Sequence, residues 1–135
     1  MILEFISGDR MKREKVLVVN DESRQRKVFV KMLKQSGYGV FEAERPEKVL
    51  EYIRKHKIDV VLLDILMPGK AGFKCLEEIQ KENSKTPVIL MSGADIDNRM
   101  IDLLKKGSIA HFRKPILRGK LDRLIKKTLN EANRR

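Results

Sequence analysis

The sequence predicts an α/β domain in which helices cover both faces of a parallel β-sheet. Three short apolar runs, "VLVV" at 16–19, "VVLL" at 60–63 and "VILM" at 88–91, do not alternate between apolar and polar positions. Such runs are typical of strands that are covered on both faces. Segments with helical spacing of their apolar residues separate these runs. Because strands and helices alternate at this pitch, we expect right-handed βαβ units and a parallel sheet.

In all, we expect five strands and five helices. Two weaker strand candidates, "GVFEA" at 39–43 and "IAHF" at 109–112, fill the remaining gaps. The helical segments are 21–37, which ends at Gly37, 46–56, which opens with Pro46, 71–82, 96–107 and 117–135. Val30 is expected to lie off the apolar stripe of the first helix. The inward-facing positions that we expect are Val28, Phe29, Met32 and Leu33; Val49, Leu50 and Ile53; Phe73, Leu76 and Ile79; and Leu117, Leu121, Leu124, Ile125 and Leu129.

Length and composition favour one cytoplasmic domain. The chain has 135 residues and a single cysteine, Cys75, which excludes an intrachain disulfide and a cysteine-based zinc site. The sequence contains no membrane-spanning apolar run and no secretory signal. We expect the domain to occupy residues 15–135, with residues 1–14 as a leader or extension in which Met11 is a candidate start.

The net charge of +11 raises the alternative of nucleic-acid binding. Against that alternative, the chain has two tyrosines and no tryptophan, and its aromatic residues do not interleave with basic ones. A solvated basic surface is therefore the favoured interpretation.

Polar residues follow the expected strands. Asn20, Asp21 and Glu22 come after the first run, Asp64 after the second and Ser92 after the third, and Arg113, Lys114 and Pro115 follow the last strand. Taken singly, Asp21 and Asp64 fit capping roles, and Ser92 and Lys114 fit turns. Because the carboxyl ends of parallel strands meet at one edge of a sheet, their succession instead predicts a site there.

The residue types at this edge suit phosphoryl chemistry. Neighbouring carboxylates repel one another unless a cation is present, and Mg²⁺ accepts one or two carboxylates while keeping bound waters. A lysine and a small hydroxyl would complete a phosphoryl pocket. No glycine-rich phosphate loop is present, so we expect the phosphoryl group on a side chain, with Asp64 as the nucleophile that forms an aspartyl-phosphate.

From about Lys15 to Leu129 the chain resembles the receiver domain of two-component response regulators, and in particular the single-domain, chemotaxis-receiver-like regulators. The motifs that carry the resemblance are "VLVVNDE", "VVLLDILMPG", "VILMSG" and "HFRKP". The resemblance implies a flavodoxin-like, doubly wound fold of three layers, with five parallel strands in the order 2-1-3-4-5 and five helices.

The resemblance also implies a role for each matching residue. Asp64 would accept a phosphoryl group from a histidine kinase or a phosphotransfer protein. Asp21, Asp64 and the backbone carbonyl of Leu66 would hold Mg²⁺ or Mn²⁺. Lys114 and Ser92 would bind the phosphoryl group, and Ser92 would move toward it as part of a switch.

Three positions depart from the family pattern or modulate it. Asn20 stands where the family usually has an acid, so it would contribute only indirectly to a weakened metal site. His111 stands where the family usually has the tyrosine or phenylalanine of the switch, either as a simple aromatic substitute or as a pH-sensitive group. The apolar Leu66, two positions after Asp64, suggests a longer-lived phosphoryl state.

The resemblance places partner docking beside the first helix. This helix carries Arg24, Arg26, Lys27 and Lys31, which predicts an acidic or strongly polar partner surface, and Val30 could belong to the contact. The downstream target is open. Apart from its own phosphorylation and dephosphorylation, we expect no enzymatic activity. Two alternatives remain, a receiver-like binding module that is not phosphorylated and a basic nucleic-acid-associated protein on the same fold.

Overall fold

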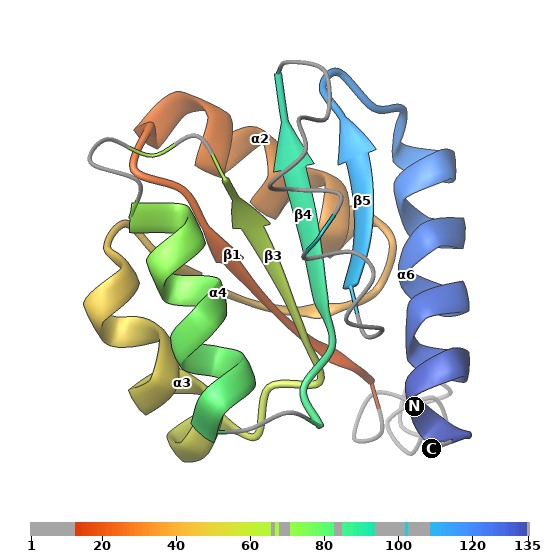
Figure 1. The fold of residues 1–135 in the computed structure, drawn as a ribbon. Helices are drawn as coiled ribbons and strands as arrows, with labels where there is room; N and C mark the ends of the chain where they lie inside the picture. The colour runs from red at the N-terminus through yellow and green to blue at the C-terminus, as the bar shows by residue number, and fades with distance from the viewer. Residues whose placement is uncertain are drawn as a thin grey trace.

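A five-stranded parallel sheet forms the centre of the molecule (Figure 1). The structure, a computed structural model, describes residues 13–65, 67, 71–82, 85–93, 102 and 109–134. The strands run in the spatial order β2-β1-β3-β4-β5, which confirms the expected order. Their bounds are β1 Lys15–Val19, β2 Gly39–Ala43, β3 Val60–Asp64, β4 Val88–Ser92 and β5 Ile109–Arg113.

The three predicted apolar runs form most of β1, β3 and β4. β3 and β4 extend each run by one residue, so that Asp64 and Ser92 are the last residues of their strands rather than the first residues of the loops. In the register, Val19 lies opposite Leu63 and Asp64 lies opposite Met91. The backbone of both polar residues is thereby fixed by the ladder of the sheet.

Four helices and one short 3₁₀ turn surround the sheet in the described part of the chain. They are α2 Ser23–Gln35, η1 Pro46–Lys48, α3 Val49–His56, α4 Ala71–Glu82 and α6 Arg118–Asn133. Of the helix expected at 96–107, every residue except 102 lies outside the described residues, so this helix stays a prediction. Within those residues, no helix has the length and apolar character needed to cross a membrane.

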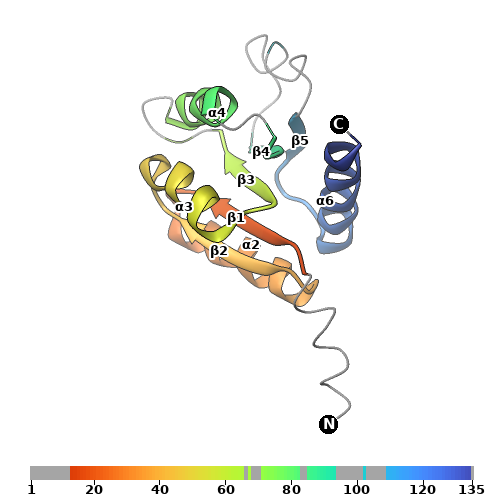
Figure 2. The same cartoon turned by 90° about the horizontal axis from the view of Figure 1, so that it is seen from below.

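Two apolar clusters, one on each face of the sheet, make up the core and give the three layers. Leu17, Val19 and Leu63 point to the face that α3 and α4 cover, together with Ile53 and Leu76 of those helices. Alternate strand residues point to the other face, where α2 and α6 pack (Figure 2). The unbroken apolar runs are explained by this arrangement, because every position of a central strand meets a helix layer.

Three side chains differ from the predicted apolar stripes. In α2, Val28 is 56% exposed whereas Val30 is 8% exposed, the reverse of the expectation. The run "VFV" is apolar throughout and does not fix the rotation of the helix; packing beside Phe29 and Leu33 places Val30 inward. Leu117 is also exposed, because it is the extended N-cap residue before α6 and not part of its inward face.

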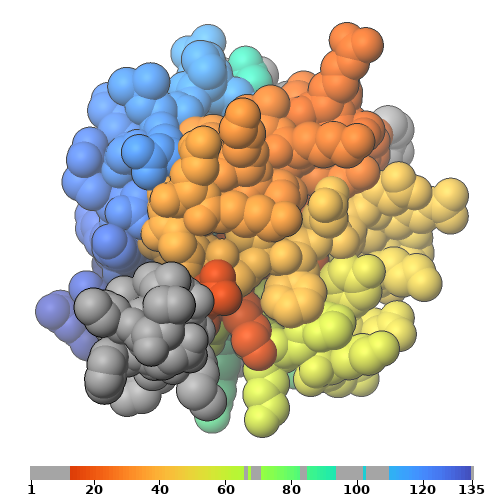
Figure 3. All heavy atoms as spheres, turned by 180° about the vertical axis from the view of Figure 1, so that it is seen from behind, coloured from red at the N-terminus to blue at the C-terminus, as the bar shows by residue number. Residues whose placement is uncertain are grey.

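Helices α2 and α6 lie side by side on one face (Figure 3). The Tyr38 hydroxyl, just after α2, donates to Asp122 Oδ1 of α6 at 2.6 Å. Within α6, Lys126 Nζ lies 3.1 Å from Asp122 Oδ2. Burial and the hydrogen bond to Asp122 raise the pKa of Tyr38. Burial alone would raise the pKa of Asp122, but the hydrogen bonds from Tyr38 and Lys126 outweigh it and hold that pKa below its usual range. The hydrogen bond from Tyr38 thus links the segment that follows α2 to α6.

Candidate functional site

Three of the predicted site residues meet at the carboxyl ends of β3, β4 and β5. Ser92 is fully buried at the end of β4 and lies opposite Arg113 in the register. The amide of Ile65 donates to the Met91 carbonyl at 3.1 Å, and the amide of Lys114 donates to the Ser92 carbonyl at 2.7 Å. Parallel pairing thus continues one step beyond the strands, and it fixes the backbone from which Asp64, Ser92 and Lys114 project.

Asp64 and Lys114 form an ion pair at this edge. Lys114 Nζ lies 3.2 Å from Asp64 Oδ2, and the two side chains are 18% and 7% exposed. A carboxylate that is removed from water is costly unless a cation or hydrogen bonds compensate for its lost solvation. Lys114 provides that compensation across 50 positions of sequence. This pair explains how a carboxylate can end a core strand.

The glycine at the second position of α4 explains how the helix approaches this strand end. A Cβ atom on Gly72 would lie 2.7 Å from the carbonyl oxygens of both Asp64 and Ile65. These distances are shorter than real Cβ contacts, so only glycine allows α4 to begin against the end of β3. The position of the Asp64 backbone therefore depends on a small residue in the next helix.

Asn20 organises the loop that leads from β1 into α2. Its side chain is fully buried; Oδ1 accepts from the Glu22 amide at 2.9 Å, and Nδ2 donates to Gln25 Oε1 at 3.4 Å. Its carbonyl oxygen accepts from Arg26 Nη1 at 2.9 Å. Both ends of the Asn20 amide thus take part in hydrogen bonds of the loop.

The two acids that follow Asn20 have different environments. Glu22 is the N-cap of α2, and its carboxylate accepts from the Arg24 amide at 2.8 Å. The capping role considered for Asp21 therefore belongs to Glu22. Asp21 is exposed in the turn before the helix. Of the two acids, Asp21 is the one whose carboxylate does not cap the helix.

Gln25, a residue that the sequence analysis did not identify, joins the loop after β1 to the strand-end residues. Lys114 Nζ donates to Gln25 Oε1 at 2.7 Å, a shorter contact than its 3.2 Å contact to Asp64. Gln25 lies in the first turns of α2, 89 positions before Lys114. A contact at that separation leaves no signal in local spacing, and a glutamine on a polar helix face looks like ordinary solvated surface.

The oxygen donors of this edge suit a small, hard cation. The described residues contain no cluster of three or more histidine, cysteine, aspartate or glutamate side chains that could hold a metal ion. Mg²⁺ does not need such a cluster, since it binds one or two carboxylates and completes its shell with water and substrate oxygens. Asp21 and Asp64 can supply the two carboxylates, so the residues present fit Mg²⁺. Leu66 lies outside the described residues.

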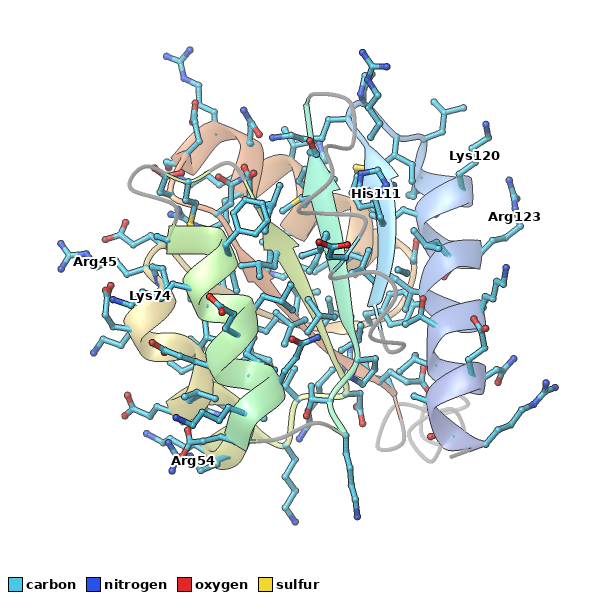
Figure 4. All side chains as sticks on the ribbon, viewed as in Figure 1. Arg45, Arg54, Lys74, His111, Lys120 and Arg123 are labelled. Atoms are coloured by element: carbon cyan, nitrogen blue, oxygen red, sulfur yellow. The ribbon has the colours of Figure 1, made fainter. Side chains whose placement is uncertain are left out.

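His111 occupies the middle of β5, beside Leu90 of β4 (Figure 4). It is partly buried, and its Nε2 atom is shielded from solvent without a hydrogen-bond partner in the described part of the chain. Burial lowers the pKa of His111 below its usual value of 6.5, because the charged form loses hydration. The imidazole is therefore neutral at pH 7.

The cations of α2 divide into two kinds. Arg24, Lys27 and Lys31 are exposed, as a docking surface requires. The side chain of Arg26 is 11% exposed, and its Nε atom lies 2.8 Å from Glu42 Oε1 of β2. Together with its contact to the Asn20 carbonyl, this shows that Arg26 ties the loop to the sheet. Unlike Arg24, Lys27 and Lys31, Arg26 therefore has its charge paired within the fold, which does not favour the docking role expected for it.

Comparisons with known proteins agree with this geometry. A family model described as the response regulator receiver domain matches residues 16–126. The chain is 32% identical over 122 residues to a probable transcriptional regulator, ycf27, of Guillardia theta, covering 90% of this chain and 48% of the relative. It is 36% identical over 116 residues to the 3',5'-cyclic-nucleotide phosphodiesterase regA of Dictyostelium discoideum, covering 82% of this chain and 15% of the relative. The chain thus spans about half or less of these relatives.

Solved structures show the same fold. A response regulator receiver domain protein from Clostridium thermocellum superposes with a TM-score of 0.80 at 29% identity, covering 89% of this chain and 97% of that one. A CheY-like receiver domain protein from Methanospirillum hungatei gives a TM-score of 0.81 at 24% identity, covering 90% and 98%. With the family match over residues 16–126 and the strand-end site in place, the chain belongs to the response regulator receiver domain family.

Proposed function

We propose that this protein is a phosphorelay receiver that accepts a phosphoryl group on Asp64 in a Mg²⁺-dependent reaction and thereby changes its binding to a partner. The observation that carries the proposal is the ion pair between Lys114 and Asp64 at the carboxyl ends of the strands. The pair combines a nucleophilic oxygen with a cation that can bind the incoming phosphoryl oxygens. The alternative of a binding module that is not phosphorylated assigns no chemical role to this pair.

The chemistry follows from the charges of the donor and of the site. An oxygen of the Asp64 carboxylate attacks the phosphorus atom, a P–O bond forms, and the P–N bond to a donor histidine breaks. The donor imidazole keeps the electron pair of that bond and takes up a proton. Lys114 offsets negative charge on the transferring group, which is the main requirement of phosphoryl transfer. Mg²⁺ held by Asp21 and Asp64 would supply further positive charge to the phosphoryl oxygens.

The proposal includes a weakened metal site. Asn20 replaces a charged side chain with a neutral one, and its amide oxygen already accepts a hydrogen bond from Glu22. The attraction between the site and a divalent cation therefore depends on the charges of two carboxylates, Asp21 and Asp64. We expect Mg²⁺ or Mn²⁺ to bind through these two, with Asn20 acting only by shaping the loop.

The proposed output is a switch of partner binding. Ser92, buried beside Asp64 on the neighbouring strand, would move toward the phosphoryl group, and His111 would respond on β5. The proposed phosphoryl donor is a histidine kinase or phosphotransfer protein with an acidic surface, which would dock on the exposed cations Arg24, Lys27 and Lys31. The chemistry of the chain would be limited to its own phosphorylation and dephosphorylation.

We propose a cytoplasmic location for this reaction. The single cysteine, Cys75, is a free, buried thiol, which suits a reducing compartment. Burial raises the pKa of this thiol to about 12, with smaller contributions from Glu78 and Glu47, so it is protonated and unreactive at neutral pH.

The experiment is incubation with acetyl phosphate and Mg²⁺, followed by intact-mass measurement under acidic conditions. We expect one phosphoryl adduct that requires Mg²⁺ and is absent in Asp64→Ala. Asp59→Ala is the matched control, because Asp59 lies just before β3 at the opposite end of the sheet, where it accepts from the Lys15 amide. An unmodified wild-type protein, or equal modification of Asp64→Ala, would reject the proposal.

A further inference from the structure

Gln25 makes the shortest contact of the Lys114 ammonium in the described site. Its side-chain oxygen lies 2.7 Å from Lys114 Nζ, whereas Asp64 Oδ2 lies 3.2 Å away. The same oxygen faces Asn20 Nδ2 at 3.4 Å. Both neighbours are donors, so the amide of Gln25 must present its oxygen to them and not its nitrogen. The orientation of this side chain is thereby fixed by its surroundings.

The consequence concerns the position of the ammonium group. Lysine has three N–H donors, and with one directed to Gln25 and one to Asp64 a third is left for a phosphoryl oxygen. A single acceptor would let the cation close fully onto the Asp64 carboxylate. A closed pair would compete with Mg²⁺ and with the phosphoryl donor for the oxygens of Asp64. A second acceptor on α2 holds the cation partly away from them.

We propose that Gln25 is a positioning residue for phosphoryl transfer, because its neutral oxygen holds the Lys114 ammonium beside Asp64 and ready for the phosphoryl group. This inference rests on the proposed function. It also gives Asn20 a structural role, because its Nδ2 atom donates to Gln25 and helps to orient that side chain. An aspartate at this position has no such donor. Asn20, which stands where receivers usually have an acid, thus contacts the amide of Gln25 in α2.

The test compares Gln25→Met, which keeps length and removes the acceptor, with Gln25→Glu, which keeps an acceptor. We expect Gln25→Met to lower the rate of phosphorylation by acetyl phosphate and the Mg²⁺ affinity of the unphosphorylated protein by about three- to tenfold each. Gln25→Glu should stay within about twofold of the wild-type rate, since a charged acceptor still holds the ammonium. A small-molecule phosphoryl donor excludes effects of partner docking on α2.

Two controls separate positioning from a general effect on α2. Gln35→Met removes the same side chain from the exposed end of the helix and should leave both quantities unchanged. In a Lys114→Ala background, Gln25→Met should have no further effect on Mg²⁺ affinity, because the residue acts through the lysine. A structural effect of Gln25 would persist in that background, and this result would overturn the proposal.

The outcomes distinguish the two levels of inference. If wild type is phosphorylated and Gln25→Met equals it in rate and in Mg²⁺ affinity, the positioning role is rejected and the receiver function stands. If Gln25→Glu is as slow as Gln25→Met, the acceptor is not what matters, and the positioning role is again rejected. If wild type accepts no phosphoryl group, both proposals are rejected together.

Discussion

The two halves of the site differ in charge and in burial. The acceptor half, Asp64, Ser92 and Lys114, projects from the ends of β3, β4 and β5, and its two charged side chains are paired and largely buried. The loop half, Asn20, Asp21, Glu22 and Gln25, spans the loop after β1 and the first turns of α2, and its acids are exposed or occupied by capping. One half is held by the sheet ladder, and the other is held by amide hydrogen bonds.

In the proposed function, this difference bears on two binding steps. Binding of a phosphoryl group would depend on the acceptor half, in which Lys114 and Asp64 are in direct contact. Binding of Mg²⁺ would depend on both halves, and in the loop half only the carboxylate of Asp21 is not used to cap the helix. We therefore expect strong selectivity for the phosphoryl group together with a modest affinity for the metal.

Loss of Lys114 should have the largest effect on the affinity of the acceptor half for a phosphoryl mimic. In Lys114→Ala we expect the dissociation constant for beryllofluoride, a stable phosphoryl mimic, to rise about ten- to a hundredfold, since a charge-assisted hydrogen bond is lost. NMR titration at saturating Mg²⁺ measures it. Lys120→Ala is the control, because Lys120 projects away from α6 (Figure 4) and should change the constant less than twofold. Equal effects of the two substitutions would contradict the claim that Lys114 of the acceptor half binds the phosphoryl group.

The packing behind the acceptor half can be tested at Gly72. We expect Gly72→Ala to lower the free energy of unfolding by about 1–3 kcal/mol, because a Cβ atom would overlap the backbone at the end of β3. Chemical denaturation measures it. In the control Gly119→Ala, the nearest atom to the new Cβ is Arg123 Nη1 at 3.6 Å, so stability should not fall. A fully stable Gly72→Ala protein would show that α4 does not fix this strand end.

An added negative charge in the loop half should raise its contribution to Mg²⁺ binding. Asn20→Asp adds a carboxylate beside Asp21 and removes the Nδ2 donor to Gln25. Because the added charge acts directly on the cation, we expect it to outweigh the lost donor and Mg²⁺ to bind about three- to tenfold more tightly. Calorimetric titration measures this. The control Asn133→Asp makes the same change in net charge at the exposed end of α6 and should leave the affinity unchanged. An unchanged affinity in Asn20→Asp would show that the loop holds this position away from the metal.

The smallest effect is expected at His111. Its lowered pKa means that the unfolded chain binds more protons than the folded one once the pH falls below about 6.5, so stability is complete above that pH and decreases below it. We expect His111→Phe to lose this decrease, which cannot exceed about 1.4 kcal/mol per pH unit for one group. Denaturation at pH 7 and pH 5 measures it. His56→Phe is the histidine control, and loss of the decrease in His56→Phe instead would contradict the assignment.

The sequence predicted that Asp64, Ser92 and Lys114 would lie at one edge, but it did not predict the contact of Gln25 with Lys114, for a physical reason. Asp64, Ser92 and Lys114 each follow an apolar strand, and parallel strands bring their ends together whatever the details of packing. Gln25 reaches the site only through the tilt of α2 and the reach of its side chain, which no local pattern encodes. The same limit explains Val28 and Val30, since the rotation of an apolar helix segment is decided by the surface against which it packs.

The most direct test is an NMR spectrum of the wild-type protein with beryllofluoride and Mg²⁺, compared with Asp64→Ala. The account predicts Mg²⁺-dependent shifts that centre on the amides of Asp64, Ser92 and Lys114 and that are absent in the variant. Absence of any shift in the wild-type protein at high Mg²⁺, or equal shifts in Asp64→Ala, would contradict the claim that this strand-end pair is a phosphoryl site.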